Sequence, residues 1–219
     1  MPRLPRVVVV GAGGHALSVL DAAVAAGWDP IAVVDSLVRT PKVFSLPRWD
    51  TLENVNLKDV RVVLGIGSNL LREGLFVGVR AKYPGARFAT IVHPSAVVSR
   101  TAELGDGSVV LSQASIGPEA SLGLGCLINT GASIDHQSSI GHFVSLAPGA
   151  RTGGQVRVDD RTFIGMNASL EQGIQIGRDA VIGAQSFVNK SLPDMIVAYG
   201  SPAREVRFVS DPEPPGIVI

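Results

Sequence analysis

A short run in the second half of the chain holds most of the side chains that could do acid–base chemistry. Asn129, Asp135, His136 and His142 lie within a stretch of fourteen residues. Histidine takes and releases protons near neutral pH, and a neighbouring carboxylate can orient its ring. Asp135 directly precedes His136, so the pair predicts a general base. A histidine beside an aspartate in a surface turn, with no catalytic role, is the alternative that these residues leave open.

A repeat of six residues surrounds this run and positions it. Every sixth residue from Val98 to Val188 is aliphatic, with Thr152 as the single exception among sixteen, and a mostly small residue follows four positions later. A period of six fits neither an amphipathic helix nor an alternating strand. It is typical of a coil in which each hexad makes one short strand and a corner. Three hexads then form one turn of a triangular prism of parallel strands, stacked about 4.8 Å apart.

The repeat also predicts which residues lie above one another. One turn of the prism takes eighteen residues, so Gly154 is the stacked neighbour of His136. Gly153 and Gly154 therefore clear side chains from the space beside this histidine. Thr152, the one lapse in the aliphatic series, falls at the same place. A histidine beside cleared space strengthens the prediction of a general base.

A metal site is a rival interpretation of the histidines. His136 and His142 are six residues apart, so they lie at consecutive corners of one turn and not side by side. Beyond His93, at the start of the prism, no third histidine falls within the repeat, whereas zinc takes three or four protein ligands. The single cysteine, Cys126, occupies a small inward position, which favours a buried structural thiol. We therefore expect no metal.

The N-terminal segment predicts a nucleotide site. Four valines at 7–10 indicate a buried strand, and a turn of the form G-x-G-x-x-A follows from Gly11 to Ala16. A helix is expected over 16–26, and a second strand over 31–35 ends in an aspartate. Glycines let the backbone approach an anion, and the helix N-terminus offers unpaired N–H groups. A glycine turn kept only for tight strand–helix packing is the alternative.

The length of this segment limits the site to one nucleotide. Strands are expected over 60–66 and 88–92, with a helix between them that begins near Asn69 and ends near Tyr83. Residues 36–59 suggest a loop that crosses the sheet. Four strands in roughly 90 residues make about half of a doubly wound domain, which suffices for a mononucleotide but not for a dinucleotide.

These patterns divide the chain into three parts. Residues 1–92 form a nucleotide-binding α/β domain, 93–192 form the prism, and 193–219 form a C-terminal segment. The final ten residues, SDPEPPGIVI, are either a loose tail or an edge strand laid on a neighbour.

Composition excludes several classes of function. The 219 residues carry 19 basic and 19 acidic side chains and only 5% aromatics, so neither nucleic acid nor an anionic membrane is an expected partner. No segment approaches the roughly 20 apolar residues of a membrane span. The apolar run at the N-terminus is too short for a signal peptide. With a single cysteine, the chain suits a reducing compartment, and we expect a cytoplasmic location.

Four motifs occur together along the chain: GAGGHA near the N-terminus, GIGSN before the second helix, HPSA at the domain junction and INTGASIDH in the prism. The combination, which extends to about Arg207, resembles the hexapeptide-repeat nucleotide-sugar N-acetyltransferases that modify 4-amino sugars for bacterial glycans. The related sialic acid O-acetyltransferases share it. The resemblance implies an N-terminal half-Rossmann βαβ domain followed by a left-handed parallel β-helix of hexapeptide repeats.

The resemblance also implies roles for individual residues. His136 would be the general base, with Asp135 and Asn129 orienting it. The expected contacts to the nucleotide sugar are Gly11, Gly13, Gly14, His15, Asp35 and Ser36. Acetyl-CoA would lie in a groove between two prisms, against Ser145, Gly154, Met166 and Ala184. Relatives often carry a histidine in the place of Ser145, so either the Ser145 hydroxyl takes over the role of that histidine or the role is not essential.

The function expected from the sequence is direct transfer of an acetyl group from acetyl-CoA to the 4-amino group of a nucleotide-linked sugar. His136 would accept the proton of the amine, and a backbone N–H near Gly154 would stabilise the oxyanion. The grooves of one prism are too open to enclose a pantetheine arm, so we expect a cyclic homotrimer. An O-acetyltransferase of sialic acid type and a non-catalytic trimeric scaffold that binds a nucleotide are the alternatives. The nucleotide and the sugar stay open.

Overall fold

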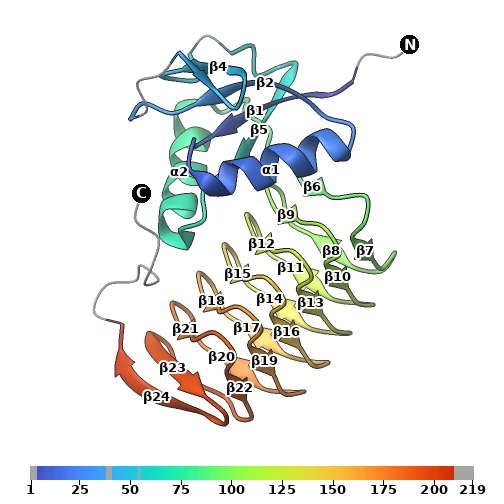
Figure 1. The fold of residues 1–219 in the computed structure, drawn as a ribbon, viewed down its shortest axis with the longest axis vertical. Coiled ribbons are helices and arrows are strands. Elements are labelled where there is room, and N and C mark those ends of the chain that lie inside the picture. Colours follow the sequence, from blue (N-terminus) through green and yellow to red (C-terminus); the bar gives the residue numbers. More distant parts are fainter. Residues whose placement is uncertain (1–3, 38–40, 54, 210–219) are drawn as a thin grey trace.

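The structure is a computed structural model, and it describes residues 4–37, 41–53 and 55–209. A small α/β layer sits at one end of a long prism of short strands (Figure 1). The α/β part consists of β1 (Arg6–Val10), α1 (Gly14–Ala25), β2 (Asp29–Val34), β3 (Lys42–Val43), β4 (Leu46–Trp49), β5 (Val60–Leu64) and α2 (Asn69–Lys82). No helix in the described ranges is long and apolar enough to cross a bilayer.

The prism is built from two-residue strands. They are β6 (Ile91–Val92), β7 (Val97–Val98), β8 (Glu103–Leu104), β9 (Val109–Val110), β10 (Ser115–Ile116), β11 (Ser121–Leu122), β12 (Leu127–Ile128), β13 (Ser133–Ile134), β14 (Ser139–Ile140), β15 (Ser145–Leu146), β16 (Arg151–Thr152), β17 (Arg157–Val158), β18 (Phe163–Ile164), β19 (Ser169–Leu170), β20 (Gln175–Ile176), β21 (Val181–Ile182) and β22 (Phe187–Val188). Two longer strands, β23 (Ile196–Gly200) and β24 (Ala203–Phe208), close the end.

The predicted half of a doubly wound domain is confirmed. Its sheet has the order β3-β4-β2-β1-β5, and β1 pairs in parallel with both β2 and β5. The valines of β1 are buried because helices or the prism cover both faces of the sheet. Helix α2 begins after Ser68, whose hydroxyl accepts a hydrogen bond from the Leu71 N–H and so caps the first turn.

Residues 36–59 contain more order than a crossing loop. Strands β3 and β4 form an antiparallel hairpin, and β4 pairs in parallel with β2 through Val33–Arg48 and Val34–Trp49. The loop prediction was wrong there because the two prolines that suggested it lie beside or within a short edge hairpin, where a missing N–H is tolerated.

The strand expected over 88–92 is divided between the two parts of the molecule. Phe88 makes only an isolated bridge to Val62, whereas Ile91 and Val92 pair with β9 inside the prism. The prism sheets therefore begin at Ile91 and continue to β24, so the predicted boundaries at 92 and 192 do not match its extent. Residues 210–219, the expected tail or edge strand, lie outside the described residues.

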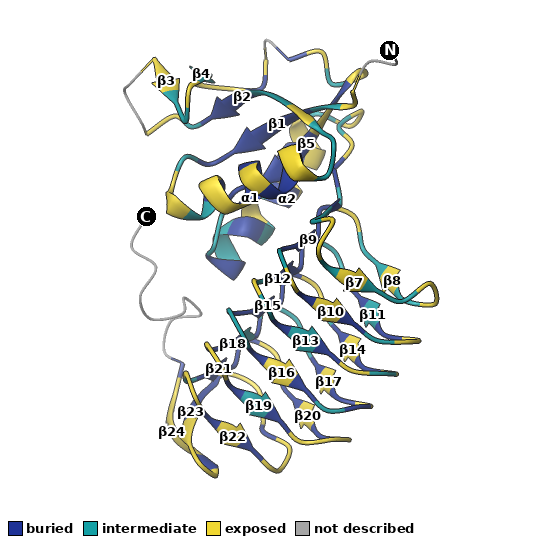
Figure 2. Cartoon of the chain, turned by 45° about the vertical axis from the view of Figure 1, so that its right-hand side comes forward, coloured by how far each residue is buried: buried dark blue, intermediate teal, exposed yellow. Residues whose placement is uncertain are grey.

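Three sheets form the faces of the prism, and up to β22 the successive strands of each sheet pair in parallel at a spacing of eighteen residues. At the end, β23 pairs in parallel with β21 at a spacing of sixteen residues, and β24 is antiparallel to β23. We name the three sheets the β6 sheet (β6, β9, β12, β15, β18, β21, β23, β24), the β7 sheet (β7, β10, β13, β16, β19, β22) and the β8 sheet (β8, β11, β14, β17, β20). Aliphatic and small residues of the repeat form one buried core, while the neighbouring strand residues of the β7 and β8 sheets are half-buried or exposed (Figure 2). The hexad prediction is confirmed.

The two parts share apolar cores. Ala16 and Val19 of α1 pack in one cluster with Val109 and Leu127 of the β6 sheet. Phe76 of α2 stacks on Phe88 and meets the Phe143 ring edge-on, with 5.4 Å between the two centroids. The α/β layer is thus seated on the first turns of one prism face, which fixes where its ligand cavity lies relative to the prism.

Candidate active site

The chain turns at His136 between β13 and β14, at a corner between the β7 and β8 sheets. We call this corner column the His136 edge. Gly154 occupies the next turn, and a Cβ built on it would lie 2.4 Å from Nε2 of His136. The imidazole therefore lies directly over Gly154, in space that the Cβ of any other residue at position 154 would occupy. The predicted stacking of the glycine on the histidine is confirmed.

A column of polar side chains at Glu119, Gln137 and Gln155 orients the Gln137 amide, which contacts the His136 ring. Gln137 donates from Nε2 to Glu119 at 3.0 Å and accepts from Gln155 at 3.2 Å, each one turn away. Because a carboxylate only accepts, the Gln137 amide must direct its oxygen toward His136, where it lies 3.4 Å from Nδ1. This contact favours the proton on Nδ1 and leaves Nε2 basic. Sequence reasoning missed the column, although the spacing of eighteen could have revealed it.

Asp135 acts on the backbone of His136 and not on its ring. Its Oδ1 accepts the His136 backbone N–H at 2.7 Å, while its own N–H donates to Oγ1 of Thr152 at 3.0 Å. The Asn129 amide oxygen accepts the Thr130 N–H at 2.9 Å, at a different corner of the prism. Within one chain the structure therefore places Asp135, but not Asn129, next to the predicted base.

The residues expected to contact acetyl-CoA fall on separate parts of the prism. Gly154 lies on the His136 edge. Exposed Met166 and Ala184 stack at corners between the β6 and β7 sheets, as does Asn129. We call this column the Met166 edge. One whole prism face separates the two edges, so a single chain does not bring these residues together.

Ser145 has a structural role, contrary to the prediction that it contacts acetyl-CoA. It is only 2% exposed, because it lies on the β6 sheet beneath α2. Its hydroxyl donates to Oδ1 of Asn69 at 2.6 Å and accepts from Arg72 at 3.1 Å. Both hydrogen bonds tie α2 to the prism and leave the hydroxyl no open side for a ligand.

The glycine turn combines a packing role with an open backbone. Gly11 has φ +103°, and a Cβ there would lie 2.4 Å from a side-chain carbon of Ile66, so this position requires glycine for its conformation and its close contact. Gly13 and Gly14 are exposed, with nothing within 4 Å of a built Cβ. The N-terminus of α1 has no side-chain cap and no acidic residue in its first turn. Packing does not explain these two glycines, and the open backbone around them leaves the helix N-terminus accessible.

Asp35 braces this turn at the carboxyl end of β2. Its Oδ2 accepts the Ala12 N–H at 2.9 Å, and its Oδ1 accepts the Leu37 N–H at 2.8 Å. The carboxyl end of β2 borders a cavity of about 470 Å³ that lies between the sheet and α2. Its lining includes Gly11, Asp35, Ser36, Leu71, Leu75, Gly74 and Gly78. The cavity is within the size range of small-ligand sites, and it places three of the predicted nucleotide contacts around one space.

His15 is held neutral at the start of α1. Burial, the larger cause, and the charge of Arg72 together lower its pKa to about 4. A neutral imidazole can both donate and accept hydrogen bonds, which suits contact with a sugar or phosphate.

The shifted pKa predicts a pH-dependent stability. The unfolded chain binds a proton to His15 below its ordinary value of 6.5, and the folded chain only below about 4, so stability is lost as the pH falls from 6.5 towards 4. We expect this group to cost about 1–3 kcal/mol at pH 4.5 relative to pH 7.5. His15→Gln removes it, so urea unfolding should show a smaller loss of stability between these pH values in the variant. An equal loss in both proteins would contradict the prediction.

Arg72 joins α2 to the prism from a fully enclosed position that sequence reasoning missed. The side chain is 3% exposed, and its Nε donates to the Gly125 carbonyl at 2.7 Å. Its two terminal nitrogens donate to Ile66, Gly67, Asn69, Phe143 and Ser145. These acceptors are carbonyl, amide and hydroxyl oxygens, and burial lowers the pKa of Arg72 to about 10.

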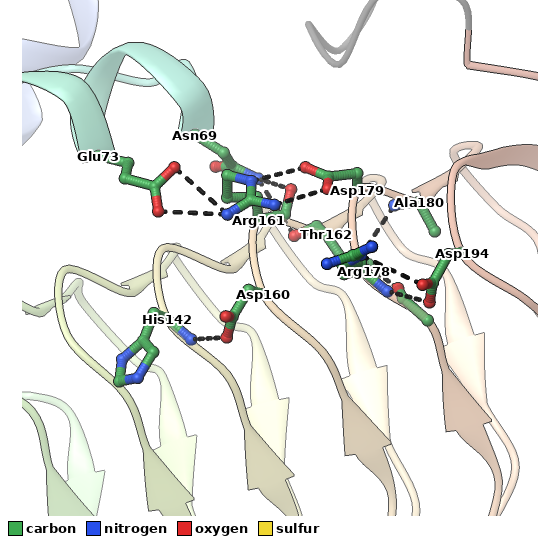
Figure 3. Close-up of polar contacts among 11 residues, drawn as sticks. Asn69, Glu73, His142, Asp160, Arg161, Thr162, Arg178, Asp179, Ala180 and Asp194 are labelled. Atoms are coloured by element: carbon green, nitrogen blue, oxygen red, sulfur yellow. Dashed lines mark hydrogen bonds and ion pairs between the residues drawn. The ribbon is translucent and has the colours of Figure 1, made fainter.

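Arg161 makes a second, more open link at the corner between the β8 and β6 sheets (Figure 3). Its guanidinium binds Asp179, one turn away, through two contacts of 2.7 Å, and Glu73 of α2 at 3.2 Å. His142 lies at the same corner column, where its N–H donates to Asp160 and its Nδ1 accepts the Leu124 N–H. His142 is therefore a structural residue of the corner.

Cys126 is the buried structural thiol that the sequence predicts, and His93 has a structural role at the entry to the prism. Cys126 is buried, its thiol donates to the Gly141 carbonyl, and burial raises its pKa to about 11. His93 accepts at Nδ1 from the Ser95 N–H at 3.1 Å and so shapes the turn that enters the prism. Among the described residues, no group of three or more histidine, cysteine or acidic side chains is placed to hold a metal ion.

The comparisons with known proteins agree with this geometry. Residues 6–78 match the PglD N-terminal domain, and residues 155–190 match the hexapeptide repeat of succinyl-transferase. PerB from Caulobacter crescentus, solved with CoA and GDP-perosamine, is 35% identical, with a TM-score of 0.85 over 92% of this chain and 97% of that one. The chain belongs to the hexapeptide-repeat nucleotide-sugar N-acetyltransferase family. Its members are acyltransferases, and so is this protein.

A second member of the family shows the same fold. The acetyltransferase domain of PglB from Neisseria gonorrhoeae FA1090 is 28% identical, with a TM-score of 0.86 over 92% of this chain and 100% of that domain. WeeI from Acinetobacter baumannii AYE, at 22% identity and a TM-score of 0.83, shares the fold. No curated protein matches the sequence. The predicted half-Rossmann domain followed by a β-helix is therefore the architecture of the family.

Proposed function

We propose that the protein transfers the acetyl group of acetyl-CoA to the 4-amino group of a nucleotide-linked sugar. The observation that carries this proposal is the His136 imidazole, which lies over Gly154 with Nε2 basic and facing cleared space. The relatives support the substrates: PerB was solved with CoA and GDP-perosamine, and the PglB domain was solved with acetyl coenzyme A.

In the proposed reaction the amine nitrogen attacks the thioester carbonyl, Nε2 of His136 takes the proton of the amine, and the CoA thiolate leaves. The oxyanion that forms needs a donor already in place. We assign this role to the backbone N–H of Gly154, because the N–H groups on either side of it are committed to Leu170 and His136. Asp135 and Gln137 hold the backbone and the ring of the base, and no acyl-enzyme is required.

We propose that the site is completed by a second copy of the chain in a cyclic homotrimer. The His136 edge carries the base and Gly154, whereas Asn129, Met166 and Ala184 lie on the Met166 edge of the same prism. Two edges separated by a face form one groove only if the Met166 edge of one prism approaches the His136 edge of the next. Asn129 would then reach His136 from the neighbouring copy, and Met166 and Ala184 would line the acetyl-CoA groove.

The nucleotide part of the substrate is assigned to the cavity beside α2. Its base would lie against the open helix face at Gly74 and Gly78, and its phosphates would approach the backbone of Gly13 and Gly14 and the side chain of His15. Ser36 and Asp35 at the end of β2 would contact the ribose or the base.

The test is an assay of CoA release with purified protein, acetyl-CoA and 4-amino sugars linked to GDP, UDP or dTDP. We expect turnover with one of these nucleotides, a product acetylated on nitrogen, and a trimeric mass in solution. Turnover only with a sialic acid hydroxyl would favour O-acetylation instead. Binding of nucleotide without any binding of acetyl-CoA in calorimetry would contradict the proposal and leave a scaffold.

A further inference from the structure

The structure assigns Thr152 as a positioning residue for the proposed base. Its hydroxyl accepts the Asp135 N–H in place of the backbone carbonyl that accepts the equivalent N–H at the other turns, and this hydrogen bond fixes the backbone position of Asp135 and His136. This inference rests on the proposed function of His136. Thr152 does not face the reacting groups, because its side chain lies inside the prism and is 7% exposed.

The hydrogen bonds along the His136 edge follow a rule that is broken once among the turns described. The residue after each inward aliphatic donates its backbone N–H to the carbonyl of the aliphatic residue one turn on. The regular cases are Ser99 to Ile116, Gly117 to Ile134, Gly153 to Leu170 and Glu171 to Val188, at 2.8–2.9 Å. At Asp135 the N–H instead donates to Oγ1 of Thr152 at 3.0 Å.

The strand pairing changes at the same point. Strands β10 and β13 pair through two residues each, as do β16 and β19, whereas β13 and β16 pair only through Ser133 and Arg151. The side chain of Thr152 thus takes the place of its own carbonyl as the partner of Asp135. This local departure from the regular coil falls on the residue directly before His136.

The altered bond is coupled to His136 through two short contacts. Asp135 Oδ1 accepts the His136 N–H at 2.7 Å, so a shift of Asp135 moves the histidine backbone. The His136 carbonyl is fixed by the N–H of Gln155 at 2.8 Å, one turn on. The ring therefore takes its position over Gly154 from the Thr152–Asp135 bond on one side and from the next turn on the other.

A purely structural threonine and a positioning threonine predict opposite results for Thr152→Val. Valine has the shape of threonine and the aliphatic type of all other positions in the series, so the coil can restore the regular N–H to carbonyl bond. We expect stability that is unchanged or raised, together with a kcat lowered about 10- to 100-fold, since small misplacements of a reacting group have such costs. Thr152→Ser retains the hydroxyl and should restore most of the activity.

Thr162→Val is the matched control. Thr162 is also a buried threonine of the prism, and its hydroxyl donates to the Gly177 carbonyl at 2.6 Å and accepts the Ala180 N–H at 3.1 Å, on the far side from His136. We expect this variant to lose thermal stability while the kcat of the folded protein is unchanged. The two valine variants thus separate loss of a buried hydroxyl from loss of the altered bond.

The decisive experiment combines the thermal midpoint and kcat of Thr152→Val, Thr152→Ser and Thr162→Val with a crystal structure of the first. The inference requires the Asp135 N–H to move to the carbonyl of residue 152 and the His136 ring to shift. A variant with wild-type kcat, or one in which the Asp135 N–H finds no new acceptor and the His136 ring keeps its wild-type position, would overturn it. The crystal structure reports on the bond even if no substrate is turned over, and His136→Ala tests the base itself.

Discussion

Replacing His136 by alanine is expected to lower kcat by about 10²- to 10⁴-fold, the usual contribution of a positioned general base. The imidazole covers Gly154 and makes no side-chain contact that holds the prism together beyond the 3.4 Å contact with Gln137, so the variant should fold normally. Both substrates should still bind, because neither the cavity beside α2 nor the Met166 edge includes His136. Steady-state kinetics with acetyl-CoA and the accepted nucleotide sugar measure kcat and both KM values.

Two further variants make this result specific. His142→Ala removes the other histidine of the same turn, whose ring accepts the Leu124 N–H, and it should cost some stability but leave kcat nearly unchanged. Gly154→Ala keeps the histidine but places a methyl group where Nε2 now lies, so it should reduce kcat without removing the base. Unimpaired turnover by His136→Ala, or equal losses in the two histidine variants, would remove the proposed mechanism.

The position of the base could be predicted because a repeat of fixed length assigns each residue a corner or a face of the prism and a neighbour in the next turn. Once each turn takes eighteen residues, the stacking of Gly154 on His136 follows with no knowledge of side-chain contacts. The inward burial of the aliphatic series follows in the same way, since a prism has one inside. For the same reason Thr152 could be noted as an exception at this corner, although its hydrogen bond to Asp135 could not.

The repeat could not predict contacts between residues that are far apart in the sequence. The repeat places Ser145 on a strand facing outward, and only the docking of α2 buries it under Asn69 and Arg72. Arg72 itself belongs to a helix whose pattern says nothing about six acceptors contributed by both parts of the molecule. Residues 88–92 have an ordinary strand sequence, so the pattern could not show that Phe88 pairs with the α/β sheet whereas Ile91 and Val92 pair within the prism.

Replacing Arg72 by methionine is expected to lower the free energy of unfolding by about 3–5 kcal/mol, the cost of breaking a buried polar arrangement on one side. Methionine fills much of the volume but leaves the carbonyls of Gly125 and Phe143 without their donor inside the molecule. Asn69 and Ser145 lose part of the same network. Urea unfolding at pH 7.5 measures the loss, and circular dichroism at the starting point checks that the variant folds.

Arg161→Met is the matched control, because Arg161 also joins α2 to the prism. Its side chain is 21% exposed and that of Glu73 is 29% exposed, whereas the Asp179 side chain is 9% exposed. Removing Arg161 therefore leaves one enclosed carboxylate rather than several enclosed groups, and a loss of about 1–3 kcal/mol, smaller than for Arg72, is expected. The two variants should also differ at His15, since the Arg72 charge lowers the pKa of that histidine and Arg161 is not among its causes. NMR titration of His15 should show a raised pKa in Arg72→Met only. Equal losses of stability in the two variants would contradict the prediction. They would mean that the burial of Arg72 does not determine the loss in free energy of unfolding, and that Arg161 contributes as much as Arg72 to the contact between the two domains.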